Sequence, residues 1–484
     1  MDSEISPPDS EHSSTHALLS LQRAESSLVR ADLSAPGAPA SEIRALRYLL
    51  GFARLTVFQP GAALDGHPTD RTDVDVAAEV EPFRARVLTE LADPIRQESD
   101  PERGIRVALD ALARLADPLR EVRGEVLRRH ANDFTATELD AECGHKRLVI
   151  VGGGGGGAGW VYVGAFRRLD QAGITPSYII GSSMGALIGL LRSRSVEIDW
   201  SHYIALAHGL DRRNLFSPIS IKRKHGLPGL LSLTLSSSIG HLFTHEDGTP
   251  VRVNQLAIPY EGVVAGVRRA AFDRLPRRFR ATAASVMRRA APLARYSARS
   301  LAPAIATRMW QVAAFFDPRV VKPIIFGADP LTAECNVVDV AGFSAAIPGV
   351  LHYDIADDDV RMHDLLRELA DGEHISALVD GGVASNVPAE QAWRRVHAGK
   401  LGTRNAFVLA WDCFHPQWDP RHLWLQPITQ AVALQQVRNA PFAVPVPTPP
   451  LPFPTPTLPF PTPTLPVPTP TLPVPTPTLP VQRW

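Results

Sequence analysis

A serine between two glycines gives this sequence its clearest chemical signal. Residues 181–185 read Gly-Ser-Ser-Met-Gly, which is the pattern Gly-x-Ser-x-Gly with Ser183 at its centre. Gly181 and Gly185 are the flanking glycines. A serine hydroxyl acts as a nucleophile when a sharp strand-to-helix turn exposes it and a base accepts its proton. The pattern is short, so an ordinary Ser/Gly turn is the alternative for this segment.

Asp380 is the base that the sequence offers. It ends the short apolar run 377–379 and is followed by Gly381 and Gly382. A carboxylate at the end of a strand could accept the Ser183 proton if the fold brings the two together and partial burial keeps the carboxylate basic. An isolated Asp-Gly pair is usually a turn, which is the alternative here.

A run of glycines ahead of the serine indicates an anion site. Residues 152–157 are all glycine, Ala158 follows, and Gly159 completes the run. Glycines let backbone N–H groups point into a shared space, and a helix after the loop adds its positive N-terminal end. The anion could be the oxyanion of a tetrahedral acyl intermediate. The candidate oxyanion donors are Gly154, Gly155, Gly156 and Gly157, with Gly155 and Gly156 as the central pair.

A dinucleotide phosphate is the other anion that this loop could bind, because residues 154–159 fit the pattern Gly-x-Gly-x-x-Gly. Such a site also needs an acidic residue about 20 positions further on, at the end of a second strand. Residues 176–180 occupy that place, contain no carboxylate and lead directly to Ser183. The sequence therefore favours the oxyanion.

The residues around these motifs predict the elements that must hold them. Residues 147–151 and 176–180 are short apolar runs typical of buried strands. Residues 163–169 and 186–191 carry the apolar pattern of helices. The glycine run and the serine motif are thus each expected at a turn from a strand into a helix.

In this order the motifs resemble the patatin-like phospholipase family. The resemblance spans roughly residues 147–413 and includes the segments 164–174 and 345–350. It implies an α/β fold, a three-layer hydrolase core with a parallel-rich central sheet. It also implies a Ser–Asp dyad that cleaves acyl esters of lipids without histidine, with Ser183 as nucleophile and Asp380 as general base. The family commonly has Arg or Lys where this sequence has Ala158, so any role of that cation is missing.

Two other functions stay open at this point, beside the dinucleotide-dependent enzyme that the glycine pattern also allows. The first is a Ser-His-Asp α/β-hydrolase, since that class also uses Gly-x-Ser-x-Gly. The histidines that could complete such a triad are His415, which follows Asp380, and His352, His363 and His374, which precede it. The second is a non-catalytic lipid- or partner-binding protein on the same fold. The dyad chemistry requires no metal and no cofactor, and three widely spaced cysteines indicate neither a disulfide framework nor a zinc site.

Composition divides the chain into four segments. Residues 1–40 are rich in Ser, Pro, Ala and acidic residues and are predicted to be disordered. Residues 41–145 carry helical patterns, and residues 146–415 form the patatin-like domain. Residues 416–484 are predicted to be a linker followed by a Pro-Thr-Leu-rich tail. The tail is expected to be disordered, with an extended polyproline II conformation, and a proline-recognition domain could bind it.

The charge pattern bears on partners. The chain is neutral, with 50 basic and 50 acidic residues, but residues 264–310 contain eleven arginines and one acidic residue. This stretch belongs to a basic insertion of about 264–325, and it predicts peripheral contact with an anionic membrane, with a solvated helical face as the alternative. Motifs that read nucleic-acid bases are absent, so no nucleic-acid partner is expected.

Residues 227–243 contain no Asp, Glu, Lys or Arg and could lie either at a lipid interface or in a buried loop. The segment is too short and too polar to predict a transmembrane helix. The first residues lack the positive and apolar regions of a secretory signal. These observations predict a cytoplasmic protein with peripheral membrane contact.

Overall fold

Alternating apolar strands build the centre of the molecule. The computed structural model describes residues 9–201, 203–204, 216–218, 225–229, 231–272, 313–413 and 426–447. Within these residues one sheet has seven strands. They are β3 (Arg147–Gly152), β4 (Tyr178–Ser182), β7 (Tyr260–Arg268), β8 (Val321–Phe326), β10 (Ile375–Asp380), β11 (Ala406–Asp412) and β12 (Val444–Pro447).

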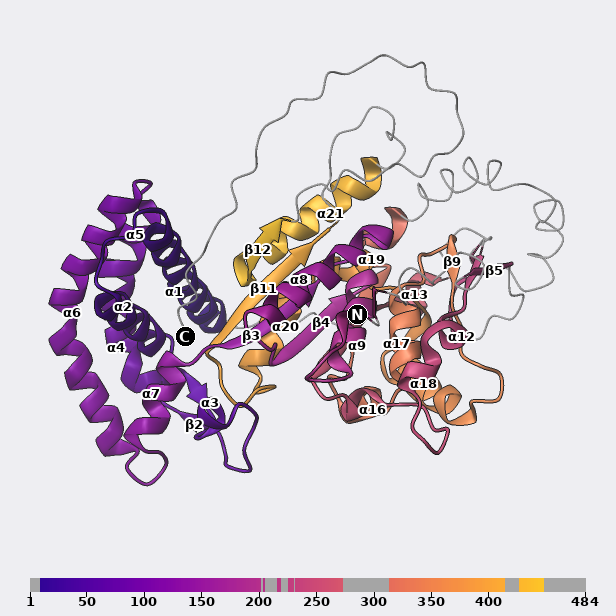
Figure 1. Cartoon of the computed structure of the whole chain (residues 1–484), viewed down its shortest axis with the longest axis horizontal. Coiled ribbons are helices and arrows are strands. Elements are labelled where there is room, and N and C mark those ends of the chain that lie inside the picture. Colours follow the sequence, from indigo (N-terminus) through magenta and orange to yellow (C-terminus); the bar gives the residue numbers. More distant parts are fainter. Residues whose placement is uncertain are drawn as a thin grey trace, which may run out of the picture. The chain divides into compact units, whose positions relative to one another are not determined.

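Five of these strands run parallel, in the order β12, β11, β3, β4 and β7. Figure 1 shows β11, β3 and β4 lying side by side. β8 and β10 both pair with β7 in the antiparallel sense. The sheet is therefore parallel-rich, as predicted, with antiparallel strands at the β7 side.

Helices cover both faces of this sheet. Successive residues of a strand point to opposite faces. Ile150 and Ile179 accordingly pack with Phe166 and Leu187 of two helices in one cluster. Val149 and Val151 pack with α20 in another. These layers confirm the predicted three-layer α/β core. Its helices are α8 (Val161–Gln171), α9 (Met184–Ser193), α12 (Leu235–Ile239), α13 (Arg269–Phe272), α16 (Pro330–Ala333), α17 (Val337–Ser344), α18 (Val360–Gly372), α19 (Gly382–Ser385), α20 (Ala389–His397) and α21 (Gln426–Asn439).

Two smaller sheets contain the other strands of the described residues. β5 (Phe216–Pro218), β6 (Leu231–Leu233) and β9 (Leu351–His352) form one, and β1 (Val57–Phe58) and β2 (Val74–Asp75) form the other. In the uncharged segment after Leu227, the side chains of Leu235, Ile239 and Phe243 lie in the main core. The positions of these three side chains agree with the prediction of a buried loop and not with that of a lipid interface.

Residues 41–145 are mainly helical. Their helices are α2 (Ala40–Ala53), α3 (Ala62–Asp65), α4 (Ala77–Val87), α5 (Asp93–Gln97), α6 (Pro101–Arg129) and α7 (Ala136–Gly144). A capping box at Thr135 begins α7, because its hydroxyl accepts the Glu138 N–H while the Glu138 carboxylate accepts the Thr135 N–H. Figure 1 shows α2 and α6 beside a further helix, α1 (Asp9–Ser34).

The prediction of disorder for residues 1–40 is wrong over α1, which spans Asp9–Ser34. Leu21, Ala24 and Leu28 are fully buried and share one helical face. The buried Glu25 carboxylate on this helix lies 2.9 Å from Lys146 Nζ, just before β3. Ser-rich composition hid an amphipathic helix whose apolar stripe packs against α6.

The predicted boundaries near the C-terminus and around the basic insertion also need correction. Residues 264–268 and 321–325 are not insertion, because they belong to β7 and β8. Residues 426–447 are not linker, since they form α21, a short 3₁₀ turn and β12. Among the described strands β12 lies at the edge of the sheet, where one side needs no backbone donor, so Pro445 and Pro447 are tolerated there.

The remaining predictions about partners fall largely outside the described residues. These include residues 273–312 of the arginine-rich stretch and residues 448–484 of the proline-rich repeat, so both the membrane contact and the proline-recognition partner stay predictions. Across the ranges that the structure describes, no helix is both long enough and apolar enough to cross a membrane.

Candidate active site

Ser183 occupies a tight turn between β4 and α9. Its backbone has φ 52° and ψ −123°, a conformation that is unusual for a residue with a side chain. The helix begins immediately afterwards and packs close to β3, so a Cβ on Gly185 would lie 2.2 Å from the Gly152 carbonyl oxygen. The glycine pattern is therefore required by the close approach of helix and strand, and the turn projects the serine from the end of the strand.

A switch of partners along β7 brings the second motif to the same place. β4 pairs with the first part of β7 and ends with Ser182 opposite Val263. β10 pairs with the next part of β7, in the opposite direction, and ends with Asp380 opposite Val264. β8 covers residues 262–267 of β7 and therefore takes the other edge. The carboxyl ends of β4 and β10 thus meet end to end on one edge of β7.

Ser183 and Asp380 touch at this junction. The Ser183 hydroxyl donates a hydrogen bond of 2.7 Å to Asp380 Oδ2. The other carboxylate oxygen accepts the Gly382 N–H at 2.7 Å. Both side chains are buried, with 8% of Ser183 and 5% of Asp380 exposed. The structure therefore brings together the two residues that the sequence singled out from segments almost 200 positions apart.

Burial makes Asp380 more basic than an ordinary aspartate. Removal from water raises the pKa of its carboxyl to about 6, although the hydrogen bonds from Ser183 and Gly382 act in the opposite direction. At neutral pH the group is then mostly ionised yet close enough to its pKa to exchange a proton. This is the property that a general base needs.

The glycine run lies beside the serine. A Cβ on Gly154 would lie 3.0 Å from Ser183 Cβ, so the loop and the hydroxyl are neighbours. The Gly154 N–H is already donated to the Asn386 carbonyl oxygen at 3.0 Å. A short 3₁₀ helix, η2 (Gly156–Trp160), begins at Gly156, where φ is 56°. The first amides of a helix have no acceptor within it. Gly155 and Gly156 therefore suit the donor role better than Gly154 does.

Two of the histidines that could have completed a triad make contacts with groups other than Ser183 and Asp380. His352 Nδ1 lies 2.9 Å from the Leu227 carbonyl oxygen, and His363 Nδ1 lies 2.9 Å from His225 Nε2. His374 lies at the start of β10, the end of that strand away from Asp380. His415 falls outside the described residues. Among the described residues, Asp380 contacts Ser183 directly.

Two residues at this junction were not assigned a role from the sequence. Ser344 ends α17, and its Oγ accepts the Ser183 N–H at 2.8 Å. Asn386 accepts the Gly154 N–H with its carbonyl oxygen and donates its own N–H to Gln435 Oε1 at 2.8 Å. The residues Asn386-Val387-Pro388, shortly after Asp380, are a sequence signal that could have drawn attention to Asn386, whereas Ser344 has none. The contacts of Ser344 and Asn386 do not follow from a short motif, because their partners Ser183 and Gly154 come from distant parts of the chain.

The fold and the site define an α/β protein with a serine–carboxylate pair at a strand-end turn. The family model for patatin-like phospholipase matches residues 150–393, and the chain belongs to this family. Family membership suggests lipid acyl hydrolase activity. A search of curated proteins finds no match. Among the described residues, no group of three His, Cys, Asp or Glu side chains is arranged to hold a metal ion.

Proposed function

We propose that this protein hydrolyses acyl esters of lipids with Ser183 as nucleophile and Asp380 as general base. The observation that carries the proposal is the hydrogen bond of 2.7 Å from the Ser183 hydroxyl to a buried carboxylate whose pKa is raised. A nucleophile and a base within hydrogen-bond reach, at a strand-to-helix turn, are the arrangement that acyl transfer requires.

The reaction has two halves. In the first, Ser183 Oγ attacks the ester carbonyl while its proton passes to Asp380. The bond to the leaving alcohol then breaks, the alcohol takes the proton from Asp380, and the acyl group stays on Ser183. In the second half, a water molecule gives its proton to Asp380 and attacks the acyl carbonyl. The fatty acid leaves as the proton returns to Ser183 Oγ.

Amides of the glycine loop stabilise the negative oxygen of each tetrahedral intermediate. We assign this role to Gly155 and Gly156, since the Gly154 N–H is bonded to Asn386 and η2 begins at Gly156. Loss of one such donor typically costs about 2.7–4 kcal/mol in the barrier. Ala158, in the position of the family's basic residue, leaves this stabilisation to backbone amides.

The test is release of fatty acid from mixed anionic and neutral phospholipid vesicles by the wild type and by Ser183→Ala. Removal of the nucleophile should reduce release by at least about 10³-fold. Ser182→Ala is the matched control, because Ser182 is the adjacent buried serine and its hydroxyl has no hydrogen-bond partner among the described residues. A serine-directed fluorophosphonate should label the wild type and the control but not Ser183→Ala.

Two results would count against the proposal. Release that survives in Ser183→Ala would exclude the dyad. Vesicle binding with neither release nor labelling in the wild type would favour the alternative of a non-catalytic lipid-binding protein on this fold.

A further inference from the structure

The meeting of β4 and β10 leaves a gap in the backbone hydrogen bonding of β7. Val263 pairs with the last residue of β4, and Val264 with the last residue of β10. At this point the Val263 carbonyl oxygen accepts a hydrogen bond from the Ser344 hydroxyl at 2.6 Å. Backbone carbonyls buried in a sheet need a donor. The Ser344 side chain supplies one where the strands change.

The same hydroxyl also holds the turn that carries the nucleophile. Ser344 Oγ accepts the Ser183 N–H at 2.8 Å while it donates to Val263. Ser344 is completely buried, so water cannot replace either hydrogen bond without a rearrangement. The unusual backbone of Ser183, with φ 52°, is therefore fixed to the sheet through one side chain.

The backbone that begins with Ser344 holds the base as well. The Gly381 N–H donates to the Ser344 carbonyl oxygen at 3.1 Å, and the Asp380 N–H donates to the Ala346 carbonyl oxygen at 2.9 Å. A Cβ on Gly381 would lie 2.0 Å from the Val263 carbonyl oxygen, so this crossing is also tightly packed. Residues 344–346 thus hydrogen-bond to both members of the Ser183–Asp380 pair.

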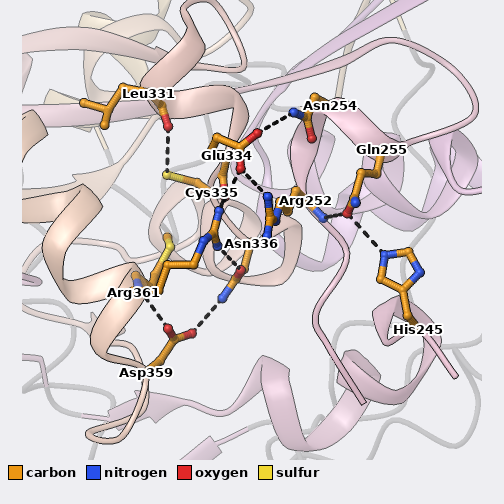
Figure 2. Close-up of polar contacts among 11 residues, drawn as sticks. His245, Arg252, Asn254, Gln255, Leu331, Glu334, Cys335, Asn336, Asp359 and Arg361 are labelled. Atoms are coloured by element: carbon orange, nitrogen blue, oxygen red, sulfur yellow. Dashed lines mark hydrogen bonds and ion pairs between the residues drawn. The ribbon is translucent and has the colours of Figure 1, made fainter. Parts of the chain in front are cut away.

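The other end of α17 is anchored independently. Figure 2 shows Asn336, which precedes the helix, within a polar network that also includes Arg361 and Asp359. Asn336 Nδ2 donates to Asp359 Oδ2 at 2.8 Å, and Arg361 forms an ion pair of 3.0 Å with Glu334. The helix therefore presents Ser344 from a fixed position.

We propose that Ser344 is a positioning residue, whose hydroxyl sets the Ser183 turn at hydrogen-bond distance from Asp380. The inference rests on the proposed function and adds a residue that does not touch substrate. Without this hydroxyl, the Ser183 N–H and the Val263 carbonyl both lose a partner, and the turn is free to relax. Proton transfer depends steeply on such geometry, so turnover should fall while lipid binding stays intact.

The sharpest test compares Ser344→Thr with Ser344→Val. The two side chains have nearly the same shape, and both add volume to a closed site, so they share any packing defect. Only threonine keeps the hydroxyl. We expect kcat for vesicle hydrolysis to be about 10- to 100-fold higher in Ser344→Thr than in Ser344→Val, with KM similar in the two. Ser193→Ala should match the wild type, because it deletes a fully buried hydroxyl that has no partner among the described residues.

The pH profile separates positioning from loss of folded protein. The hydrogen bond from Ser183 lowers the pKa of Asp380. If Ser344→Val lets the serine move away, the pKa of Asp380 rises and the acid side of the kcat/KM profile moves to higher pH. A variant that is merely less stable would show fewer fluorophosphonate-labelled sites but an unchanged profile. Activities are therefore expressed per labelled site.

Two outcomes would overturn these proposals. Equal turnover per labelled site in the threonine and valine variants, with the same acid limb, overturns the role of Ser344 while leaving the dyad standing. A wild type that is neither active nor labelled overturns the proposed function, and this inference falls with it.

Discussion

Asp380 and Asp339 are two buried aspartates associated with opposite ends of the same helix. Asp339 lies in the first turn of α17, and the Asp380 N–H bonds to Ala346, just after the last turn. Burial raises the pKa of each carboxyl to about 6. Each also accepts a short hydrogen bond from a hydroxyl, Tyr353 at 2.6 Å for Asp339 and Ser183 at 2.7 Å for Asp380. By basicity alone the two sites are alike.

The difference lies in the hydroxyl that each acid faces. Tyr353 is packed in the core, where its phenol is a structural hydrogen-bond donor to Asp339. Asn336 Nδ2 also donates to Asp339, at 3.1 Å, which makes that end of α17 a closed polar anchor. Ser183 instead sits at a constrained turn beside the glycine loop. A raised pKa therefore marks a candidate acid or base only when its partner is a nucleophile beside a site for the substrate.

The largest expected difference between the two aspartates is in catalytic activity. Asp380→Asn should reduce fatty acid release by at least about 10³-fold, because an amide cannot accept the serine proton. Asp339→Asn should stay within about threefold of the wild type, since its amide oxygen can still accept from Tyr353. Parallel vesicle assays of the two purified variants measure both. A comparable loss in Asp339→Asn would mean that the two ends of α17 are not functionally distinct.

The pH dependence sharpens the comparison further. With a pKa of about 6, Asp380 is protonated and inactive as a base at low pH. The value of kcat/KM should therefore rise through about pH 6 and level off above it. Asp339→Asn should show the same limb, even though it removes another group that titrates in this range. Rates measured between about pH 5 and pH 9 test this. If the acid limb disappears in Asp339→Asn, the titration belongs to Asp339 and not to Asp380.

The sequence predicts the dyad because each half lies in a short motif with a local physical cause. The glycines around Ser183 permit a tight turn, and Asp380 follows an apolar strand. Both features can be read without knowledge of the fold. The parallel-rich sheet was predicted by a different route, because it is what the resemblance to the patatin-like phospholipase family implies.

Ser344 and α1 escape sequence reasoning for different reasons. Ser344 acts at a change of strand partners on β7, which is set by pairings between distant segments and has no local pattern. The apolar stripe of α1 is present in the sequence, but the Ser-rich composition of residues 1–40 obscured it. The hydrogen bond of the Gly154 N–H could not be predicted either, because its acceptor is the carbonyl oxygen of Asn386, which is distant in the sequence.

The smallest expected effect concerns stability, where the two aspartates should behave alike again. The pKa of each carboxyl is raised in the folded protein, so the folded state holds the proton at a pH where the unfolded chain has lost it. The favourable contribution is present below the unfolded pKa of about 4 and is lost as the pH rises through about 6. At pH 8 each ionised carboxylate then destabilises the fold, by at most about 3 kcal/mol.

Asparagine removes that ionisation, so Asp380→Asn and Asp339→Asn should each melt at least as high as the wild type at about pH 8, and lose this advantage at about pH 4. Thermal unfolding of the three proteins at both values measures it. Equal gains in Tm, with turnover lost only in Asp380→Asn, would show that burial produces the same electrostatic cost at both ends of α17, and that only the Ser183 end uses it for chemistry. A lower Tm for Asp380→Asn at about pH 8 would mean that its hydrogen bonds outweigh the cost of its buried charge.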